Sequence, residues 1–185
     1  MARTGLILCG LVICLAGLSY RFPYGVDISD APRGLYVSLT LIAGIVWATI
    51  AFQIQSSSHR WPSLWVIVAI GLVMRAAMMV SIPVLADDSY RYLWDGAVVA
   101  NGVDPYEYAP AAASPNSAFG FSEPQTEAPD LERLKALAEA NREAHSRINY
   151  PYVSTIYPPL AQAGFLFAHW IDPFGLGGWR LILLL

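Results

Sequence analysis

The chain alternates between long apolar runs and one stretch that is rich in charge. The apolar runs cover residues 5–20, 34–54, 64–85 and 156–171. A helix needs about twenty apolar residues to cross a hydrocarbon core about 30 Å thick, and the second and third runs reach this length. The pattern therefore predicts an all-α, polytopic transmembrane protein in which a long extracytoplasmic loop, containing surface helices, connects the spans.

The two ends of the chain determine how many membrane-spanning helices we expect. Residues 5–20 have the length of a signal-peptide core, which leaves a cleaved leader as an alternative to a first span. Residues 15–19 form a poor cleavage site, which favours an uncleaved span. We thus expect three N-terminal transmembrane helices in residues 1–86, and a fourth plus the start of a fifth in residues 156–185. The last apolar run, 179–185, stops short of a span, so we expect a truncated chain.

Charge divides the sequence at the same places. Residues 34–86 contain only Arg60 and Arg75, whereas residues 87–147 contain eleven acidic and five basic residues. The short connection at 53–63 carries Arg60 without any acid, and the positive-inside rule places such loops in the cytoplasm. The segment 87–155 is therefore expected on the outer side of the cell membrane, as one extracytoplasmic loop.

Within this loop the pattern predicts two helices. Residues 87–100 are typical of a helix that starts at the membrane surface. The proline-rich residues 101–129 predict an irregular crossing. Residues 130–147 then return to helix, with Asp130 as the N-cap and a stripe of leucines that faces the membrane or the rest of the loop.

Composition excludes two classes of function. The net charge of −3, with Lys135 as the single lysine, argues against a nucleic-acid partner, because a phosphate backbone requires clustered basic side chains. Cys9 and Cys14 both lie in the first apolar run, where neither a disulfide framework nor a zinc site is expected.

Acidic, basic and aromatic side chains gather at the start of the loop. On a helix, Asp88 and Arg91 are spaced i,i+3, while Asp87 and Asp95 each lie four residues from Arg91. A carboxylate can act as general base or metal ligand, and an arginine fork can clamp a phosphate. The alternative interpretation is a set of surface charges at a helix end, where acids are favourable for dipole reasons alone. The aromatic residues among these charges, which offer stacking surfaces, are Tyr90, Tyr92 and Trp94.

Three motifs follow one another along the chain: Asp87–Gly96 (DDSYRYLWDG), Asn101–Tyr106 (NGVDPY) and Thr155–Gln162 (TIYPPLAQ). Together they resemble motifs of bacterial membrane glycosyltransferases of the GT-C class, in the mannosyltransferase-like branch. Those enzymes are polytopic and take a sugar from a polyprenyl-phosphate carrier on the outer face of the membrane. The resemblance covers about residues 75–185, and residues 1–74 add only hydrophobic spans.

The resemblance implies the transfer of a sugar, expected to be mannose, from a polyprenyl-phosphate donor to a cell-envelope glycan or glycolipid acceptor. Asp88 would be the base, with Asp87 as second candidate, and either could ligate a divalent cation, Mg²⁺ or Mn²⁺. Related enzymes show an Asp-acidic-x-Arg-Tyr pattern, but here Ser89 replaces the second acid and Asp87 precedes instead. Which of the two aspartates is the base therefore stays open.

Further roles follow from the same resemblance. In the catalytic loop 87–155 that the resemblance implies, Arg91 would compensate the charge of the leaving phosphate. Asp104–Tyr106 is interpreted first as a turn and second as a substrate contact. A different class of function is a non-catalytic transporter subunit or scaffold with an acidic partner-binding loop. A transporter predicts several charges at mid-membrane, whereas only Arg75 lies in the middle of a span, which favours the enzyme. The substrate-binding residues implied are Arg91, Tyr92, Trp94, Asp95 and Tyr157.

Overall fold

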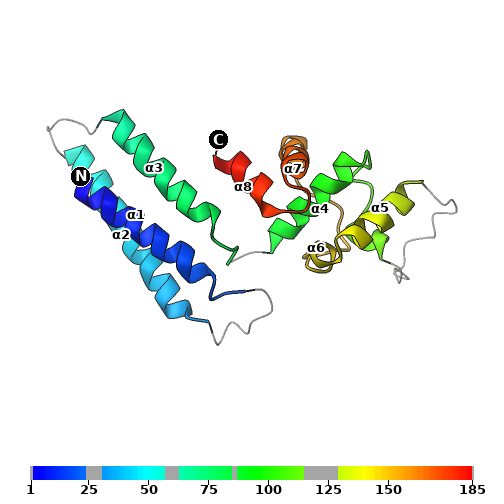
Figure 1. The fold of residues 1–185 in the computed structure, drawn as a ribbon, viewed down its shortest axis with the longest axis horizontal. Coiled ribbons are helices and arrows are strands. Elements are labelled where there is room, and N and C mark those ends of the chain that lie inside the picture. The colour runs from blue at the N-terminus through cyan, green and yellow to red at the C-terminus, as the bar shows by residue number, and fades with distance from the viewer. Residues whose placement is uncertain (1, 24–30, 57–62, 85–86, 115–128, 185) are drawn as a thin grey trace. The chain divides into compact units, whose positions relative to one another are not determined.

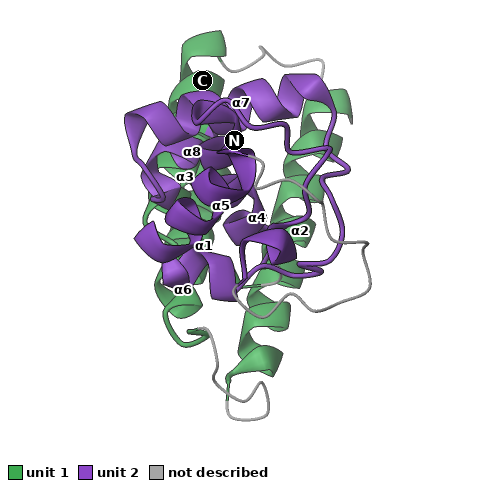
Figure 2. Ribbon diagram, turned by 90° about the vertical axis from the view of Figure 1, so that its right-hand side faces the viewer, with its two compact units in different colours: residues 1–84, 184 green, residues 85–183, 185 purple. Residues whose placement is uncertain are grey.

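The computed structural model describes residues 2–23, 31–56, 63–84, 87–114 and 129–184. These residues form helices joined by turns, with no strand among them, so the all-helical prediction is confirmed (Figure 1). The chain divides into two compact units, residues 1–84 and residues 85–183 (Figure 2). Each unit is built on its own helices and is described separately.

The first unit consists of three apolar helices, α1 (Ala2–Ser19), α2 (Arg33–Ser56) and α3 (Leu64–Met79). Helix α1 packs against both α2 and α3. A cavity of about 310 Å³ lies between the three helices and is lined by apolar side chains and glycines. Most large apolar side chains of this unit are nevertheless exposed, for example Trp47 and Trp65. Such surfaces are typical of helices that face lipid or other helices rather than water.

Helix α2 is the one helix in the described part of the chain that is long and apolar enough to cross a membrane. The helices α1 and α3 are apolar but shorter. Helix α3 ends at Met79 rather than continuing to residue 85 as the apolar run suggested, because the chain turns at Val80 and reaches Pro83. Its 16 residues span about 24 Å at 1.5 Å per residue. The polytopic topology therefore stays a prediction.

Two polar side chains at the end of α1 hold the residues that follow α3. The Ser19 hydroxyl donates a hydrogen bond to the Ala16 carbonyl at 2.6 Å and accepts one from the Ile82 amide at 3.0 Å. The Tyr20 hydroxyl donates to the carbonyl of Val80. These bonds satisfy backbone groups that the end of α3 would otherwise leave unpaired.

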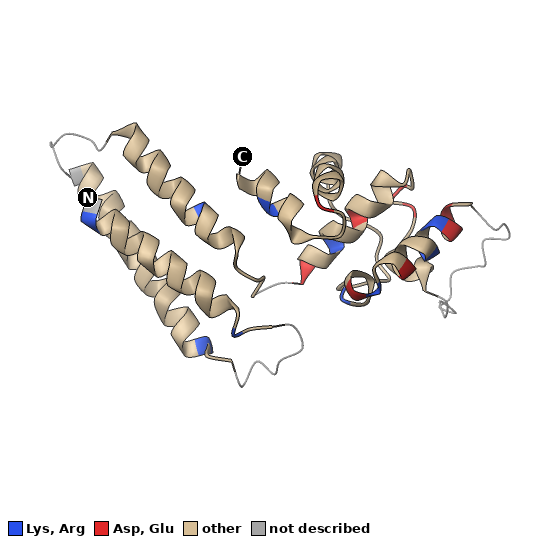
Figure 3. Cartoon of the chain, viewed as in Figure 1, with Lys and Arg blue, Asp and Glu red and all other residues tan. Residues whose placement is uncertain are grey.

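The second unit contains the loop that the sequence predicted to be charged. In Figure 3 most charged residues of this unit lie on α4, α5 and α6, while α7 contains no lysine, arginine or acidic residue. Its elements are α4 (Asp88–Ala100), η1 (Pro110–Ala113), α5 (Pro129–Ala140), α6 (Arg142–Ser146), α7 (Pro159–Ile171) and α8 (Leu176–Leu184).

Helix α4 forms the centre of this unit and packs against α5, α6 and α7. It begins and ends within one residue of the predicted helix 87–100. The leucine stripe of α5 packs on the rest of the loop, since Leu134 is almost fully buried in the same core as Trp94. The buried core residues are Trp94, Val98, Val103, Ala113, Leu134, Ala138 and Ile148.

The second predicted helix, 130–147, is divided into α5 and α6. The break falls at Asn141, whose side-chain oxygen accepts a hydrogen bond from the Ala144 amide at 2.9 Å and so caps a new helix. The predicted N-cap, Asp130, lies instead inside the first turn of α5, where its carboxylate pairs with Arg133 at 3.3 Å. Of the predicted irregular crossing, residues 101–114 contain turns and η1, and residues 115–128 lie outside the described residues.

Helices α4 and α7 cross at a glycine. A β-carbon built on Gly96 would lie 2.4 Å from the backbone carbonyl oxygen of Phe165, closer than real side chains approach a backbone. Only the absence of a side chain at this position allows the two helix backbones to approach so closely. The crossing places the first residues of α4 and the segment before α7 in one unit with little freedom to separate.

Candidate active site

Two carboxylates stand at the start of α4. Asp87 is the N-cap residue and Asp88 is the first helical residue, and both side chains are partly exposed. The Asp87 carbonyl accepts a hydrogen bond from the Tyr90 amide at 3.0 Å, but its carboxylate does not cap the helix. Within the described ranges neither carboxylate has a hydrogen-bonding partner, so both are available to a ligand.

One helical turn further along α4, Arg91 is buried and forms hydrogen bonds. Its Nε donates to Asp95 Oδ1 at 2.8 Å, and its Nη1 donates to the carbonyl of Val153 at 2.9 Å. The remaining nitrogen, Nη2, is buried and has no partner among the described residues. The predicted i,i+4 pairing of Arg91 and Asp95 is present, but the guanidinium lies below the surface, with 9% of its side chain exposed.

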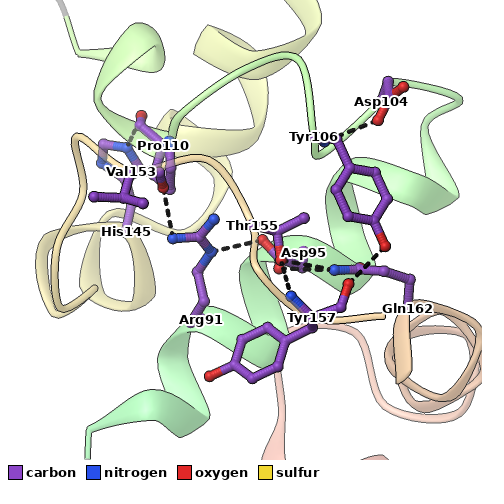
Figure 4. A network of polar contacts seen from close by, with 10 residues as sticks. All are labelled: Arg91, Asp95, Asp104, Tyr106, Pro110, His145, Val153, Thr155, Tyr157 and Gln162. Carbon is purple, nitrogen blue, oxygen red and sulfur yellow. Dashed lines mark hydrogen bonds and ion pairs between the residues drawn. The ribbon is translucent and has the colours of Figure 1, made fainter. Parts of the chain in front are cut away.

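Asp95 connects α4 to α7. Its second oxygen, Oδ2, accepts a hydrogen bond from Gln162 Nε2 at 3.1 Å, and the same amide nitrogen donates to Thr155 Oγ1 at 2.9 Å (Figure 4). Asp95 is 1% exposed and Gln162 is 4% exposed. The first and third motifs, 67 residues apart at this bond, are therefore in direct contact.

The second motif joins the same network. Asp104 Oδ1 accepts from the Tyr106 amide at 2.8 Å, which forms the turn interpreted from Asp104–Tyr106. The Tyr106 hydroxyl donates to the Tyr157 carbonyl at 2.6 Å, and the Thr155 amide donates to the Pro105 carbonyl at 3.2 Å. All three motifs thus meet around one set of hydrogen bonds, which Figure 4 shows.

An aromatic cluster lies on the neighbouring face of α4. The Tyr92 ring stacks on Phe165 with centroids 4.7 Å apart, meets Tyr157 edge-on at 5.2 Å, and contacts Trp179 at 5.4 Å. Asp88 precedes Tyr92 by four residues on α4, so the two side chains lie on the same face of that helix. Two of the predicted site residues, Tyr92 and Tyr157, therefore contact each other, and Tyr92 lies on the helix face that carries the partly exposed Asp88.

The remaining residues of interest lie elsewhere. Trp94 is 2% exposed and belongs to the core, where its ring lies 4.8 Å from that of His145. Arg75 lies on the exposed surface of α3 in the first unit and forms no ion pair within the described ranges. Of the predicted site residues, the structure therefore brings Tyr92 and Tyr157 into contact, with Asp88 one turn before Tyr92 on α4 and Asp87 at the N-cap.

The two aspartates suit a hard divalent cation. Magnesium is usually held by one or two carboxylates together with water and substrate phosphates. Asp87 and Asp88 offer two adjacent carboxylates without other partners among the residues described. No group of three or more His, Cys, Asp and Glu side chains that could enclose an ion exists in that part of the chain. A cation on Asp87 and Asp88 would thus need further ligands from water and substrate, and it stays a prediction.

Two contributors to the network were not singled out from the sequence. Gln162 and Thr155 stand inside the third motif, but only the motif as a whole was noted. A glutamine between two alanines on an apolar helix was the available signal, because a buried amide must find hydrogen-bonding partners. The Val153 carbonyl, which binds Arg91, gave no signal, since backbone groups are present at every position.

The fold and the site define an all-helical protein in which one apolar unit, containing a helix able to cross a membrane, precedes a unit with an acidic face. The family described as alpha-(1->6)-mannopyranosyltransferase, N-terminal domain (MptA_B family) matches residues 5–126, which are 122 of the 185 residues. The chain belongs to this family, and the membership supports a glycosyltransferase with sugar donor and acceptor substrates. No curated protein and no solved structure matches the chain. The family match includes the first two motifs and ends before the third.

Proposed function

We propose that this chain contributes to a multi-pass membrane glycosyltransferase that moves mannose from a polyprenyl-phosphate donor to a cell-envelope glycan or glycolipid. Family membership supports the transfer of a sugar. The donor, the acceptor and the outer face of the membrane are proposals that rest on the three motifs and on the charge pattern. The observation that supports the site is the pair of carboxylates at the start of α4 that have no hydrogen-bonding partner among the described residues, one turn from Tyr92 of the aromatic cluster.

Asp88 is the proposed general base. Asp88 lies four residues before Tyr92, on the same face of α4, and Tyr92 in turn meets Tyr157. The Asp88 carboxylate has no hydrogen-bonding partner among the described residues. Asp87, at the N-cap, is the second candidate for the base. Flat tyrosine rings suit the apolar faces of a sugar, so Tyr92 and Tyr157 are the proposed walls of the sugar site.

The proposed reaction is a single displacement. The Asp88 carboxylate takes the proton of an acceptor hydroxyl while that oxygen forms a bond to the anomeric carbon of the donor sugar. The bond between the anomeric carbon and the phosphate oxygen breaks, and its electron pair leaves with the polyprenyl phosphate. Asp88 then releases its proton to water. General-base assistance of this kind contributes about 10²–10⁴-fold.

The leaving phosphate requires positive charge. Arg91 supplies it in this proposal through its field rather than by a direct clamp, because Nε and Nη1 are engaged and Nη2 is buried. A divalent cation on Asp87 and Asp88, if bound, would add Lewis-acid compensation of the phosphate charge. Preorganised charge at a developing anion is usually a large catalytic contribution.

The test is sugar transfer from a radiolabelled polyprenyl-phosphate mannose donor in membranes that contain the full chain. Asp88→Asn keeps the size of the side chain but cannot take a proton at neutral pH, so the rate is expected to fall by about 10²–10⁴-fold. The matched control is Asp130→Asn, since Asp130 forms only a surface ion pair, which contributes little.

Two results would contradict the proposal. Full transfer by a stably expressed Asp88→Asn variant would remove Asp88 as the base. A wild-type protein that transfers nothing from either mannose or glucose donors would contradict the enzyme itself and favour a membrane protein that binds a partner through its acidic loop.

A further inference from the structure

Gln162 is a buried polar side chain on a helix that is otherwise apolar. It lies in the first turn of α7, is 4% exposed, and stands between Ala161 and Ala163. Burying an amide without hydrogen bonds costs about 1–3 kcal/mol in proteins, so its partners are what make the position tolerable. Both of the hydrogen bonds that it donates reach residues outside α7.

These two hydrogen bonds join three segments at one nitrogen atom. Nε2 donates to Asp95 on α4 at 3.1 Å and to Thr155 in the segment before α7 at 2.9 Å. Thr155 in turn accepts from the Tyr157 amide at 3.3 Å through its hydroxyl oxygen. Figure 4 shows the Gln162 amide pointing toward Asp95 and Thr155. The amide therefore connects α4 directly to the segment 155–157.

The hydrogen bond from Gln162 also engages the second carboxylate oxygen of Asp95. One carboxylate oxygen accepts from Arg91 and the other accepts from Gln162, so both oxygens are engaged and the side chain is held in one rotamer. Arg91, fixed by Asp95, donates to the Val153 carbonyl at 2.9 Å. Residues 153–157 are thus attached to α4 at one end through Arg91 and further along through Gln162.

The attached segment carries part of the proposed sugar site. The Tyr157 ring meets Tyr92 of α4 edge-on at 5.2 Å, and Tyr92 lies on the same face of α4 as Asp88, which precedes it by four residues. Gln162 itself lies under this surface and has no exposed face to offer a substrate. A change at Gln162 would therefore alter the distance between Tyr157 and the Asp88 face without removing any group that contacts the sugar.

We propose that Gln162 is a positioning residue that fixes Tyr157 against the face of α4 that carries Asp88, by holding Asp95 and Thr155 at one amide nitrogen. This inference rests on the proposed function, because it takes the Asp88 face as the site of sugar transfer. If Tyr157 is displaced, we expect the rate of the chemical step to fall more than the affinity for the long donor lipid.

The first experiment replaces Gln162 by leucine in the full chain. Leucine keeps the approximate volume and removes both hydrogen bonds. A misplacement of about 1 Å in an active site can cost about 100-fold in rate, so we expect kcat for transfer from polyprenyl-phosphate mannose to fall by that order while KM for the donor stays close to wild type. The matched control is Gln53→Leu, the same change at an exposed position of α2.

The second experiment uses Gln162→Glu and a pH profile. The new carboxylate would lie against Asp95, and two like charges so close share one proton, which raises the pKa of the pair. The hydrogen bond to Asp95 is then present at low pH and is lost as pH rises through that raised pKa. Activity relative to wild type is therefore expected to increase as pH falls, a response that a loss of packing alone would not produce.

Hydrogen exchange separates the failure of this inference from the failure of the proposed function. Faster amide exchange of residues 153–157 in Gln162→Leu is expected whether or not the transfer substrate is correct. Unchanged exchange, or wild-type kcat and KM in Gln162→Leu, would overturn the positioning role while leaving the Asp88 result intact. A wild-type protein without transfer activity would overturn the proposed function, and with it a positioning role in catalysis.

Discussion

Replacing Gly96 by alanine tests the helix crossing on which the site depends. The added β-carbon would lie 2.4 Å from the Phe165 carbonyl oxygen, whereas ordinary contact begins at 3.4 Å. The difference, 3.4 − 2.4 = 1.0 Å, must be supplied by moving α7 away from α4, because both contacting groups belong to backbones. Overpacking of this kind costs about 1–3 kcal/mol in the free energy of unfolding.

The same displacement should reach the network beneath the site. The hydrogen bond from Gln162 to Asp95 is already 3.1 Å long, and a further 1 Å would exceed the length of a hydrogen bond. We therefore expect Gly96→Ala to lower the thermal unfolding midpoint of the detergent-purified full chain by several degrees, and to lower sugar transfer by about 100-fold.

The control is Gly44→Ala on α2, where a β-carbon would meet nothing within 4 Å. Alanine is favoured over glycine inside a helix by about 1 kcal/mol, so this variant is expected to be neutral or slightly stabilising. If Gly96→Ala melts and transfers sugar like Gly44→Ala, the close crossing of α4 and α7 is wrong, and the coupling drawn between the crossing and the site is wrong with it.

Two further predictions concern charge at the site. Arg91→Lys keeps the positive charge but cannot donate hydrogen bonds to both Asp95 and Val153. The rate of sugar transfer should therefore fall, but less than in Arg91→Ala. Equal rates for the two variants and wild type would contradict a role for this charge. If Asp87 and Asp88 hold a cation, chelation with EDTA should lower the rate of sugar transfer, and adding Mg²⁺ or Mn²⁺ should restore it. A transfer rate that EDTA does not change would assign both carboxylates to other roles.

Much of the local structure was readable from sequence. Helix α4 begins where the acidic pair follows an apolar run, and the leucine stripe of α5 predicted its buried face correctly. The break between α5 and α6 was missed because Asn141 can cap a new helix with its side chain, while helical periodicity continues past it. Periodicity also could not decide which aromatic of α4 enters the core, since Tyr90, Tyr92 and Trp94 all neighbour apolar positions.

The sequence by itself determined the apolar runs, the acidic loop and the three motifs, because each of these depends on residues that are close together in the chain. Only the tertiary structure decided which residues of the motifs contact one another. Arg91 reaches a carbonyl 62 residues away, and Asp95 meets Gln162 across 67 residues. These pairings depend on the close approach of α4 and α7 at Gly96 and on the backbone carbonyl of Val153. Local sequence patterns reveal neither of them. The pairings decide that Arg91 and Asp95 lie beneath the surface while Asp87 and Asp88 stand on it.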